Sequence, residues 1–478
     1  MTTNDDTMPG HDLVDAVSEK GSALYLGMVC LVASLGGFLF GFDTAVISGT
    51  VEFVRQQFQL SELQVGWFGG SALYGCIVGA LIAGSLSDRF GRKPVLIVSA
   101  LLFFISALLS AIPPTFAVLI PARIIGGVGV GMASVVAPMY ISEFAPPHLR
   151  GRLVALYQLS IVIGILAAYF SNWSLLRFSE NSPEAFGGQG ILHWTMVAEI
   201  WRGMFGAEMI PAVLFLLFLC LVPESPRWLI NAGRNRRGFE ILARIGGTRI
   251  AQSQVTEIKD ALAHEEGSIF ELFKPGLRIA LIVGVGLSFF GQLTGVNIVI
   301  YYGPEILKAA GFAIGERLQF QVAFGLINLV ATIIALCFID RWGRRPLLIG
   351  GMAMVVVSLV GIAVLFLLGP NVGFWIAAVM GIYVGCLAIS ICAVIWVLSP
   401  EIFPNRVRGR AMSIATFTNW TTNAATASLF LWYVERFGMH TGFFTFAAIC
   451  LVATIFFWKL VPETKGKTLE EIEKGWTA

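Results

Sequence analysis

The chain alternates between long apolar blocks and short polar segments. Each block holds roughly 20 mainly hydrophobic residues, the length of helix that crosses the ~30 Å hydrocarbon core of a bilayer. The blocks lack the apolar–polar alternation of a strand, and backbone groups in lipid must be paired, so each block is expected to be a helix. The pattern predicts twelve membrane-spanning helices, at residues 25–48, 65–87, 94–113, 116–139, 152–172, 203–222, 278–302, 319–339, 346–368, 373–398, 411–434 and 441–461.

The composition favours an integral membrane protein of the all-α class. Of the 478 residues, 56% are hydrophobic and 13% are charged, whereas soluble domains are about 25% charged. The net charge of +2 is spread over short clusters between the blocks, so no nucleic-acid partner is expected. All seven cysteines lie within apolar blocks, which favours buried thiols over disulfides or metal ligands. We expect no metal and no cofactor, and we interpret the acidic first 22 residues as a tail and not a signal peptide.

Basic residues are unevenly distributed between the two sides of the predicted membrane. With a cytoplasmic N-terminus, the cytoplasmic segments hold 25 of the 32 Lys and Arg residues and the outer loops hold six, while Arg123 lies within a helix. Positive charge collects on the cytoplasmic side of membrane proteins. We therefore predict a multi-pass protein of the cell membrane with both termini in the cytoplasm.

Several polar motifs occur twice, at equivalent places in the two halves of the chain. Asp88-Arg-Phe-Gly-Arg-Lys-Pro94 follows the second predicted helix, and Asp340-Arg-Trp-Gly-Arg-Arg-Pro346 follows the eighth. A Glu precedes an Arg-Gly-Arg sequence by seven residues after helices 4 and 10, and a Pro-Glu pair follows helices 6 and 12. Two parallel repeats are typical of alternating-access carriers. The predicted division is an N-terminal tail (1–24), a six-helix half (25–222), a helical cytoplasmic linker (223–277), a second six-helix half (278–461) and a C-terminal tail (462–478).

The repeated motifs place carboxylates and guanidinium groups together at cytoplasmic helix ends. Arg forms bidentate pairs with carboxylates, so these groups are candidates for a latch that closes when the carrier faces outward and parts when it faces inward. The alternative is that the Arg residues only set topology. The candidate latch residues are Asp88, Arg89, Arg92, Glu143, Arg150, Arg152, Glu224, Arg227, Asp340, Arg341, Arg344, Glu401, Arg408 and Glu463.

The same motifs resemble those of a known family. Gly84-x-x-x-Asp88-Arg-Phe-Gly-Arg-Lys93 resembles the signature of the major facilitator superfamily, and Pro223-Glu-Ser-Pro-Arg-Trp228 and Pro462-Glu-Thr-Lys-Gly-Lys467 resemble sugar porter signatures. The patterns are similar to those of bacterial proton-coupled sugar symporters of the D-xylose type and of facilitative glucose transporters. The resemblance implies an alternating-access carrier with short cytoplasmic helices in the linker.

Three charged residues, Asp43, Arg123 and Glu208, lie well inside predicted spans, away from their ends. Placing a charged side chain at the bilayer centre costs ~2.5–3.5 kcal/mol, so each of the three should have a partner or a functional role. They lie at similar depth in the first half, where a cluster of two carboxylates and one guanidinium would suit a proton carrier. The resemblance implies the same, because the Gly36–Gly49 segment is similar to the symporters' first helix, in which an Asp couples to protons. The alternative is a static pair that braces two helices.

Amide and aromatic side chains within the spans suit a sugar, whose hydroxyls donate and accept and whose C–H face is apolar. Interhelical hydrogen bonding is the alternative for each single amide. The segment from Gln292 to Tyr302 resembles the family's sugar-binding seventh helix, whose glycines allow it to break as a gate, and this makes Tyr301 a gating candidate. The candidate sugar-binding residues are Gln158, Gln292, Asn297, Asn328, Trp396, Asn419 and Trp420.

These observations predict a proton-coupled monosaccharide symporter that acts as a monomer, with a sugar, protons and the lipid bilayer as its partners. Gly291, Ile165 and Asn419 stand where the xylose symporters are expected to have Gln, which favours a hexose such as glucose over D-xylose. A facilitative uniporter of the same fold is the main alternative, and a transporter-like sugar sensor is a further one. An enzyme is not expected, because we find no nucleophile–base pair, metal cluster or phosphate loop in the sequence.

Overall fold

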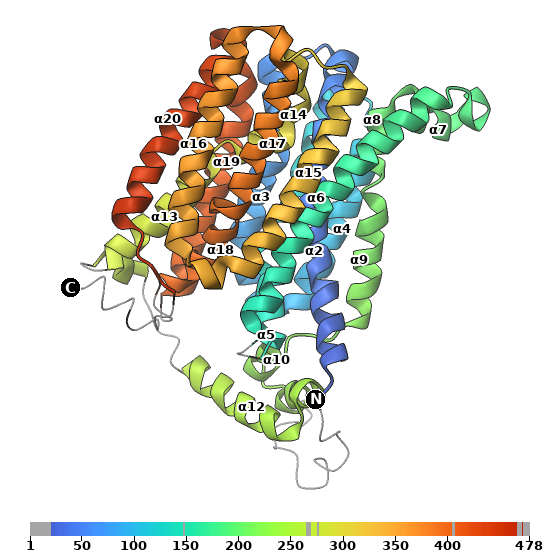
Figure 1. The fold of residues 1–478 in the computed structure, drawn as a ribbon. Helices are drawn as coiled ribbons and strands as arrows, with labels where there is room; N and C mark the ends of the chain where they lie inside the picture. Colours follow the sequence, from blue (N-terminus) through green and yellow to red (C-terminus); the bar gives the residue numbers. More distant parts are fainter. Residues whose placement is uncertain are drawn as a thin grey trace.

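The computed structural model describes residues 21–146, 149–263, 269–274, 277–403, 407–465 and 471. Within these ranges the regular structure is helical, and the long helices run side by side in one bundle (Figure 1). The start of α2 and the end of α20 lie at the same end of the bundle. This end also carries the helices that connect the halves, so we call it the linker end and the opposite one the distal end.

The first half contains α2 (Ala23–Phe58), α3 (Glu62–Phe90), α4 (Arg92–Ala111), α5 (Phe116–Phe144), α6 (Arg150–Asn181), α8 (Ile200–Gly206) and α9 (Met209–Leu221). A short excursion between α6 and α8 contains η1 (Ala185–Gly188), α7 (Gly190–His193) and η2 (Trp194–Ala198). The connection between the halves contains α10 (Pro226–Asn231), α11 (Asn235–Gly246), α12 (Thr248–Ala263) and η3 (Ile269–Phe273).

The second half contains α13 (Leu277–Leu293), α14 (Val296–Ala309), α15 (Ile314–Trp342), α16 (Arg344–Leu368), η4 (Pro370–Val372), α17 (Gly373–Ile389), α18 (Ile391–Glu401), α19 (Arg408–Phe437) and α20. The last of these covers Met439–Leu460. Helix is thus present at each of the twelve predicted blocks, although the long helices extend several residues beyond most of the predicted ends.

Eleven helical segments of the described residues are long and apolar enough to cross a membrane. The remaining predicted span is α19, which has 30 residues but carries Thr and Asn side chains along its length. Many of these polar side chains are buried within the bundle and do not face lipid. The low hydropathy of α19 therefore reflects its position in the interior.

Three of the predicted spans are interrupted. The seventh breaks between α13 and α14 at Gly295, whose φ of +84° is a left-handed conformation that glycine adopts readily. The hydroxyl of Tyr383 donates to the carbonyl of Thr294 (2.6 Å), which satisfies a backbone group freed by the break. The sixth span is irregular at Glu208, between α8 and α9, and the tenth breaks at Ser390, between α17 and α18.

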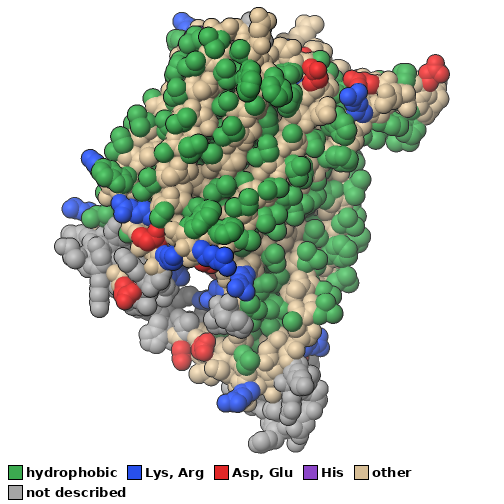
Figure 2. Space-filling model, viewed as in Figure 1, with side chains coloured by type: hydrophobic (Ala, Val, Ile, Leu, Met, Phe, Trp, Pro, Cys, Tyr) green, Lys and Arg blue, Asp and Glu red, His purple; other side chains and the backbone are tan. Residues whose placement is uncertain are grey.

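Glycine lets the helices pack closely. A Cβ on Gly75 or Gly79 of α3 would lie 2.1 or 2.2 Å from backbone oxygens of α5. Small residues are a usual basis of helix association in membranes, because lipid provides no hydrophobic drive between helices. Between the halves, α3 packs on α19 and α6 packs on α15. Hydrophobic side chains cover the flank of the bundle, and Lys and Arg gather towards the linker end (Figure 2).

Candidate transport site

A cavity of about 140 Å³ lies between the two halves. From the first half it is lined by α2 and α6, and from the second by residues of α13 to α15 and α17 to α19. All seven residues predicted to bind sugar line it, namely Gln158, Gln292, Asn297, Asn328, Trp396, Asn419 and Trp420. Tyr301, the predicted gating residue, lines it too. Side chains from separate helices are thus brought together at one place.

Three of the lining amides form a hydrogen-bonded chain. Asn297 Nδ2 donates to Gln292 Oε1 (2.5 Å), and Gln292 Nε2 donates to Asn419 Oδ1 (2.7 Å). An amide has two donors and an oxygen with two lone pairs, so each member keeps groups that can bind a ligand hydroxyl. The chain joins α13, α14 and α19 and fixes the orientation of the amides that face the cavity.

Two indole rings supply the apolar part of the lining. Trp396 is 41% exposed, whereas Trp420 is 2% exposed and has its ring centroid 5.5 Å from that of Phe40. The Nε1 of Trp420 is buried and has no hydrogen-bond acceptor among the described residues. The cavity therefore combines the flat apolar surfaces of the indoles with the polar groups of the amides.

The sequence reasoning missed three polar lining residues, Thr44, Thr332 and Asn423. Asn423 Nδ2 donates to the hydroxyl of Tyr301 (3.2 Å) and so links α19 to α14. The signal was present, because Asn423 follows Asn419 by four residues, and residues at this spacing share one face of a helix.

Asp43 and Arg123 form a buried ion pair beside the cavity. Arg123 Nη1 donates to Asp43 Oδ1 (2.5 Å), and Nη2 donates to the backbone oxygen of Asp43 (3.2 Å). Both residues are 1% exposed, and the guanidinium also lies over the ring of Phe205, 5.1 Å from its centroid. The next residue, Thr44, lines the cavity. Asp43 therefore lies on the same helix as residues that line the cavity.

Glu208 completes this cluster at the break between α8 and α9. It is fully buried, and its carboxylate oxygens accept no hydrogen bond from a donor of the described residues. It lies close enough to Asp43 and Arg123 for their charges to act on its carboxyl group. The three charged residues predicted from separate spans are thus in one cluster.

At the distal end, ion pairs join the two halves. Glu52 of α2 binds Arg317 (2.5 Å) and Lys308 (2.9 Å), which belong to the second half. Arg55 of α2 binds Glu305 (3.1 Å) as well as Glu62 of its own half (2.9 Å). We call these six residues the distal lock.

The distal lock was not predicted, because its charges lie in predicted outer loops or at the ends of predicted spans, where nothing in the sequence indicates which charges meet. Next to it, the hydroxyl of Tyr302 donates to the backbone oxygen of Ala427 (2.9 Å). Together these contacts close the bundle at its distal end.

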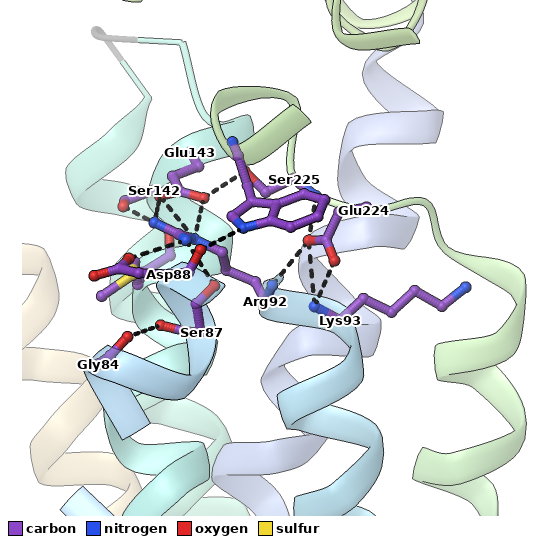
Figure 3. A network of polar contacts seen from close by, with 11 residues as sticks. Gly84, Ser87, Asp88, Arg92, Lys93, Ser142, Glu143, Glu224 and Ser225 are labelled. Carbon is purple, nitrogen blue, oxygen red and sulfur yellow. Dashed lines mark hydrogen bonds and ion pairs between the residues drawn. The ribbon is translucent and has the colours of Figure 1, made fainter. Parts of the chain in front are cut away.

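At the linker end of the first half, Arg92 is the centre of a polar network (Figure 3). Its guanidinium binds Glu143 through two nitrogens (2.9 and 3.0 Å) and also binds Asp88 (3.1 Å). Glu224 accepts from the backbone N–H groups of Arg92 and Lys93 and so caps the start of α4. Burial raises the pKa of Glu224, although these N–H groups oppose the shift.

The second half repeats this arrangement. Arg344 binds Asp340 (2.9 Å) and Glu401 (3.0 Å). Glu463 accepts from the backbone N–H groups of Arg344 and Arg345, both at 3.1 Å, at the start of α16. Burial alone would raise the pKa of Glu463, but the backbone hydrogen bonds outweigh it and the pKa is lowered.

Other candidate latch residues lie outside these two networks. Arg89 lies over Phe90 and Arg341 over Phe338, Arg152 is exposed, and Arg227 is half-buried on α10. Arg408 donates to the carbonyl of Phe403 (3.2 Å) and lies close enough to Arg150 of the first half for their charges to repel. The ion pairs of Arg92 and of Arg344 each lie within one half, whereas the distal lock joins the two halves.

Comparison with known proteins identifies the family to which the chain belongs. A profile of the family described as "Sugar (and other) transporter" matches residues 29–476. The chain belongs to this sugar transporter family. The transporter is 39% identical to the arabinose-proton symporter of Bacillus subtilis (strain 168) over 96% of this chain and 97% of that protein. It is also 39% identical to the D-xylose-proton symporter of Escherichia coli (strain K12), over 95% and 96%.

The fold agrees with this assignment. The partially occluded, inward-open structure of the E. coli xylose transporter XylE superposes with a TM-score of 0.80, at 36% identity, over 93% of this chain and all of that one. The predicted major facilitator fold with twelve membrane-spanning helices is therefore confirmed.

Proposed function

We propose that the transporter is a proton-coupled monosaccharide symporter. The observation that carries this proposal is the adjacency of two sites: a cavity lined by amides and indoles, and a buried cluster of Asp43, Arg123 and Glu208 directly behind α2. The cavity is smaller than the ~300–1,000 Å³ of sites that hold drug-sized ligands, which suits a single sugar unit.

The charge cluster explains why a proton would travel with the sugar. Two ionised carboxylates beside one guanidinium leave a net charge of −1 in a buried region, which is costly. Uptake of one proton by Asp43 or Glu208 makes the cluster neutral. A neutral cluster can pass between the outward-facing and inward-facing states at lower cost, so the change of access is coupled to protonation.

Alternating access follows from the two ends of the bundle. With the linker end in the cytoplasm, as the distribution of basic residues predicts, the distal lock closes the outer side and the structure faces inward. Opening to the outside requires the pairs of Glu52 and Arg55 with the second half to break. The networks around Arg92 and Arg344 hold the helix ends within each half, so that each half moves as a unit.

Within the monosaccharides, we propose a hexose such as glucose before D-xylose. Gly291 and Ile165 both line the cavity and give it no polar side chain at positions where the xylose symporter pattern has amides. A hexose such as glucose carries a CH₂OH group that xylose lacks, and Gly291, which has no side chain, leaves room for it.

Purified transporter in proteoliposomes provides the test. A panel of hexoses and pentoses is measured in counterflow, and each transported sugar is then measured with an imposed inward proton gradient. Symport predicts accumulation above the outside concentration, which collapses when a protonophore is added. Equilibration without accumulation would establish the facilitative uniporter instead, and preference for pentoses would overturn the proposed hexose specificity.

A further inference from the structure

An arm extends from the bundle at its distal end. It consists of residues 173–199, that is, the last part of α6 with η1, α7 and η2. We call it the distal arm. The 32 residues of α6 would span about 48 Å at 1.5 Å per residue, which exceeds the ~30 Å hydrocarbon core. Figure 1 shows that the arm projects sideways from the bundle and not straight away from it.

The distal arm is an ordered hairpin. Ser179 Oγ donates to the carbonyl of Val197 (3.2 Å), and the rings of Phe178 and Phe186 lie 6.2 Å apart across the hairpin. At its base, Trp194 Nε1 donates to Glu199 (2.8 Å), and Arg202 binds the same carboxylate (2.6 Å). These contacts fix the direction in which the arm leaves the bundle.

The arm exposes large apolar side chains. Phe186 is 49% exposed, Ile191 is 67% exposed and Leu192 is 54% exposed. Phe186 also adopts a left-handed conformation (φ +59°), which is unfavourable for a bulky residue. Burying these side chains in an apolar environment would offset that cost. Exposed apolar groups of this size, gathered on one segment, indicate a surface that is covered by a partner.

We propose that the distal arm lies in the interfacial layer of the bilayer, with its apolar side chains among the lipids. The arm continues the exposed apolar surface of α6. Leu156, Ile163 and Phe170 are exposed at intervals of seven residues and so form a stripe along that helix. The next position of the stripe is Arg177, which is half exposed. A stripe that changes from apolar to Arg is typical of the level at which hydrocarbon gives way to headgroups, because Arg extends to the phosphates.

Two further features support a position of the arm in the interfacial layer. Trp173 and Trp194 lie in the arm, and Trp is enriched at membrane–water interfaces. Figure 2 shows hydrophobic side chains along the lower edge of the arm, with charged ones at its tip and near its base. Interfacial segments have this division, with the apolar face buried by about 5–10 Å. The arm would thus anchor the first half of the transporter in the outer leaflet.

The test uses the full-length transporter in lipid nanodiscs, with a fluorophore attached at Leu192→Cys. The matched control is Glu184→Cys, at an exposed acidic position of the same hairpin. Both are made without the exposed Cys220 and Cys337, and the parental protein measures background labelling. Spin-labelled phosphatidylcholine with the nitroxide near the headgroup quenches probes in the interface, whereas iodide quenches probes in water.

Quenching by the labelled lipid should be at least about twofold stronger at Leu192 than at Glu184, with the opposite order for iodide. Equal quenching by iodide at both positions would show that the arm lies in water and would overturn the proposal. Protection from both quenchers with crosslinking between subunits would assign the surface to a second copy and would also overturn it. Ile191→Cys serves as a second probe if Leu192→Cys gives no folded protein.

Discussion

Replacement of Asp43 by Asn separates proton coupling from sugar movement. Asn keeps the shape of the side chain but has no titratable proton. Arg123 loses its 2.5 Å contact with a carboxylate yet keeps the 3.2 Å hydrogen bond to the backbone oxygen of residue 43. Loss of one partner from a buried pair costs about 3–5 kcal/mol when the remaining charge is uncompensated. Because Glu208 lies beside the pair and can supply the negative charge, we expect a smaller loss of stability.

The effect on transport follows from the energy of the gradient. One pH unit is worth about 1.4 kcal/mol per proton, which supports about tenfold sugar accumulation if one proton moves with each sugar. The wild type should approach this ratio, whereas Asp43→Asn should accumulate no sugar above the outside concentration. Counterflow should persist, because Asp43 itself does not line the cavity.

The assay compares gradient-driven uptake with counterflow in the same proteoliposomes. Glu52→Gln is the matched control, since it removes a carboxylate from the distal lock and leaves the cluster intact. It should change the rate of turnover but not the accumulation ratio at equilibrium. If Asp43→Asn accumulates sugar as well as the wild type, Asp43 is not the coupling residue, and Glu208→Gln becomes the next variant to measure.

Four further predictions concern the other parts of the molecule. Trp396→Ala should weaken sugar binding by about 2 kcal/mol, or roughly 30-fold in Kd by isothermal titration, whereas Trp375→Ala, outside the cavity, should not change it. Arg317→Gln should favour the distal-open state, so that cysteines engineered at that end react faster; unchanged rates would show that the distal lock does not hold the closed state. Charge reversal in Glu143→Lys should unpair Arg92 within the first half, lower the melting temperature and slow transport, and an unchanged melting temperature would contradict this. The lowered pKa of Glu463 means that its ionised form stabilises the protein above pH 4.5 and that this contribution is lost as the pH falls below it, so Glu463→Gln should flatten the acid side of the melting-temperature profile.

The sequence predicted the fold well because the constraint of the bilayer is strong. Apolar blocks long enough to cross it must be helical, and this holds even for α19, whose interior position lowers its hydropathy. The charged residues Asp43, Arg123 and Glu208 were found for the same reason, since each stands out in an apolar block. Gln292 and Asn297 were found because an amide within a span must face the interior.

The features that sequence reasoning missed depend on distances between segments far apart in the chain. The distal lock brings Glu52 together with Arg317, 265 residues away. Charged residues are expected in loops and at helix ends, so neither stood out. Nothing in the sequence distinguishes Phe186 either, because its exposure and its left-handed backbone are features of the structure. The identity of the sugar depends on the fit of hydroxyls in the cavity, which no single residue type reveals.

Because of the break at Gly295, α14 is a separate helix that connects the cavity to the distal lock. Asn297 and Tyr301 face the cavity, and Glu305 and Lys308 belong to the distal lock, so one helix of 14 residues carries both sets of contacts. Sugar binding at the start of α14 and the ion pairs towards its end are then linked by one coupling free energy. Such coupling is reciprocal. The factor by which closure of the distal end changes the affinity for sugar equals the factor by which bound sugar changes the equilibrium constant for closure.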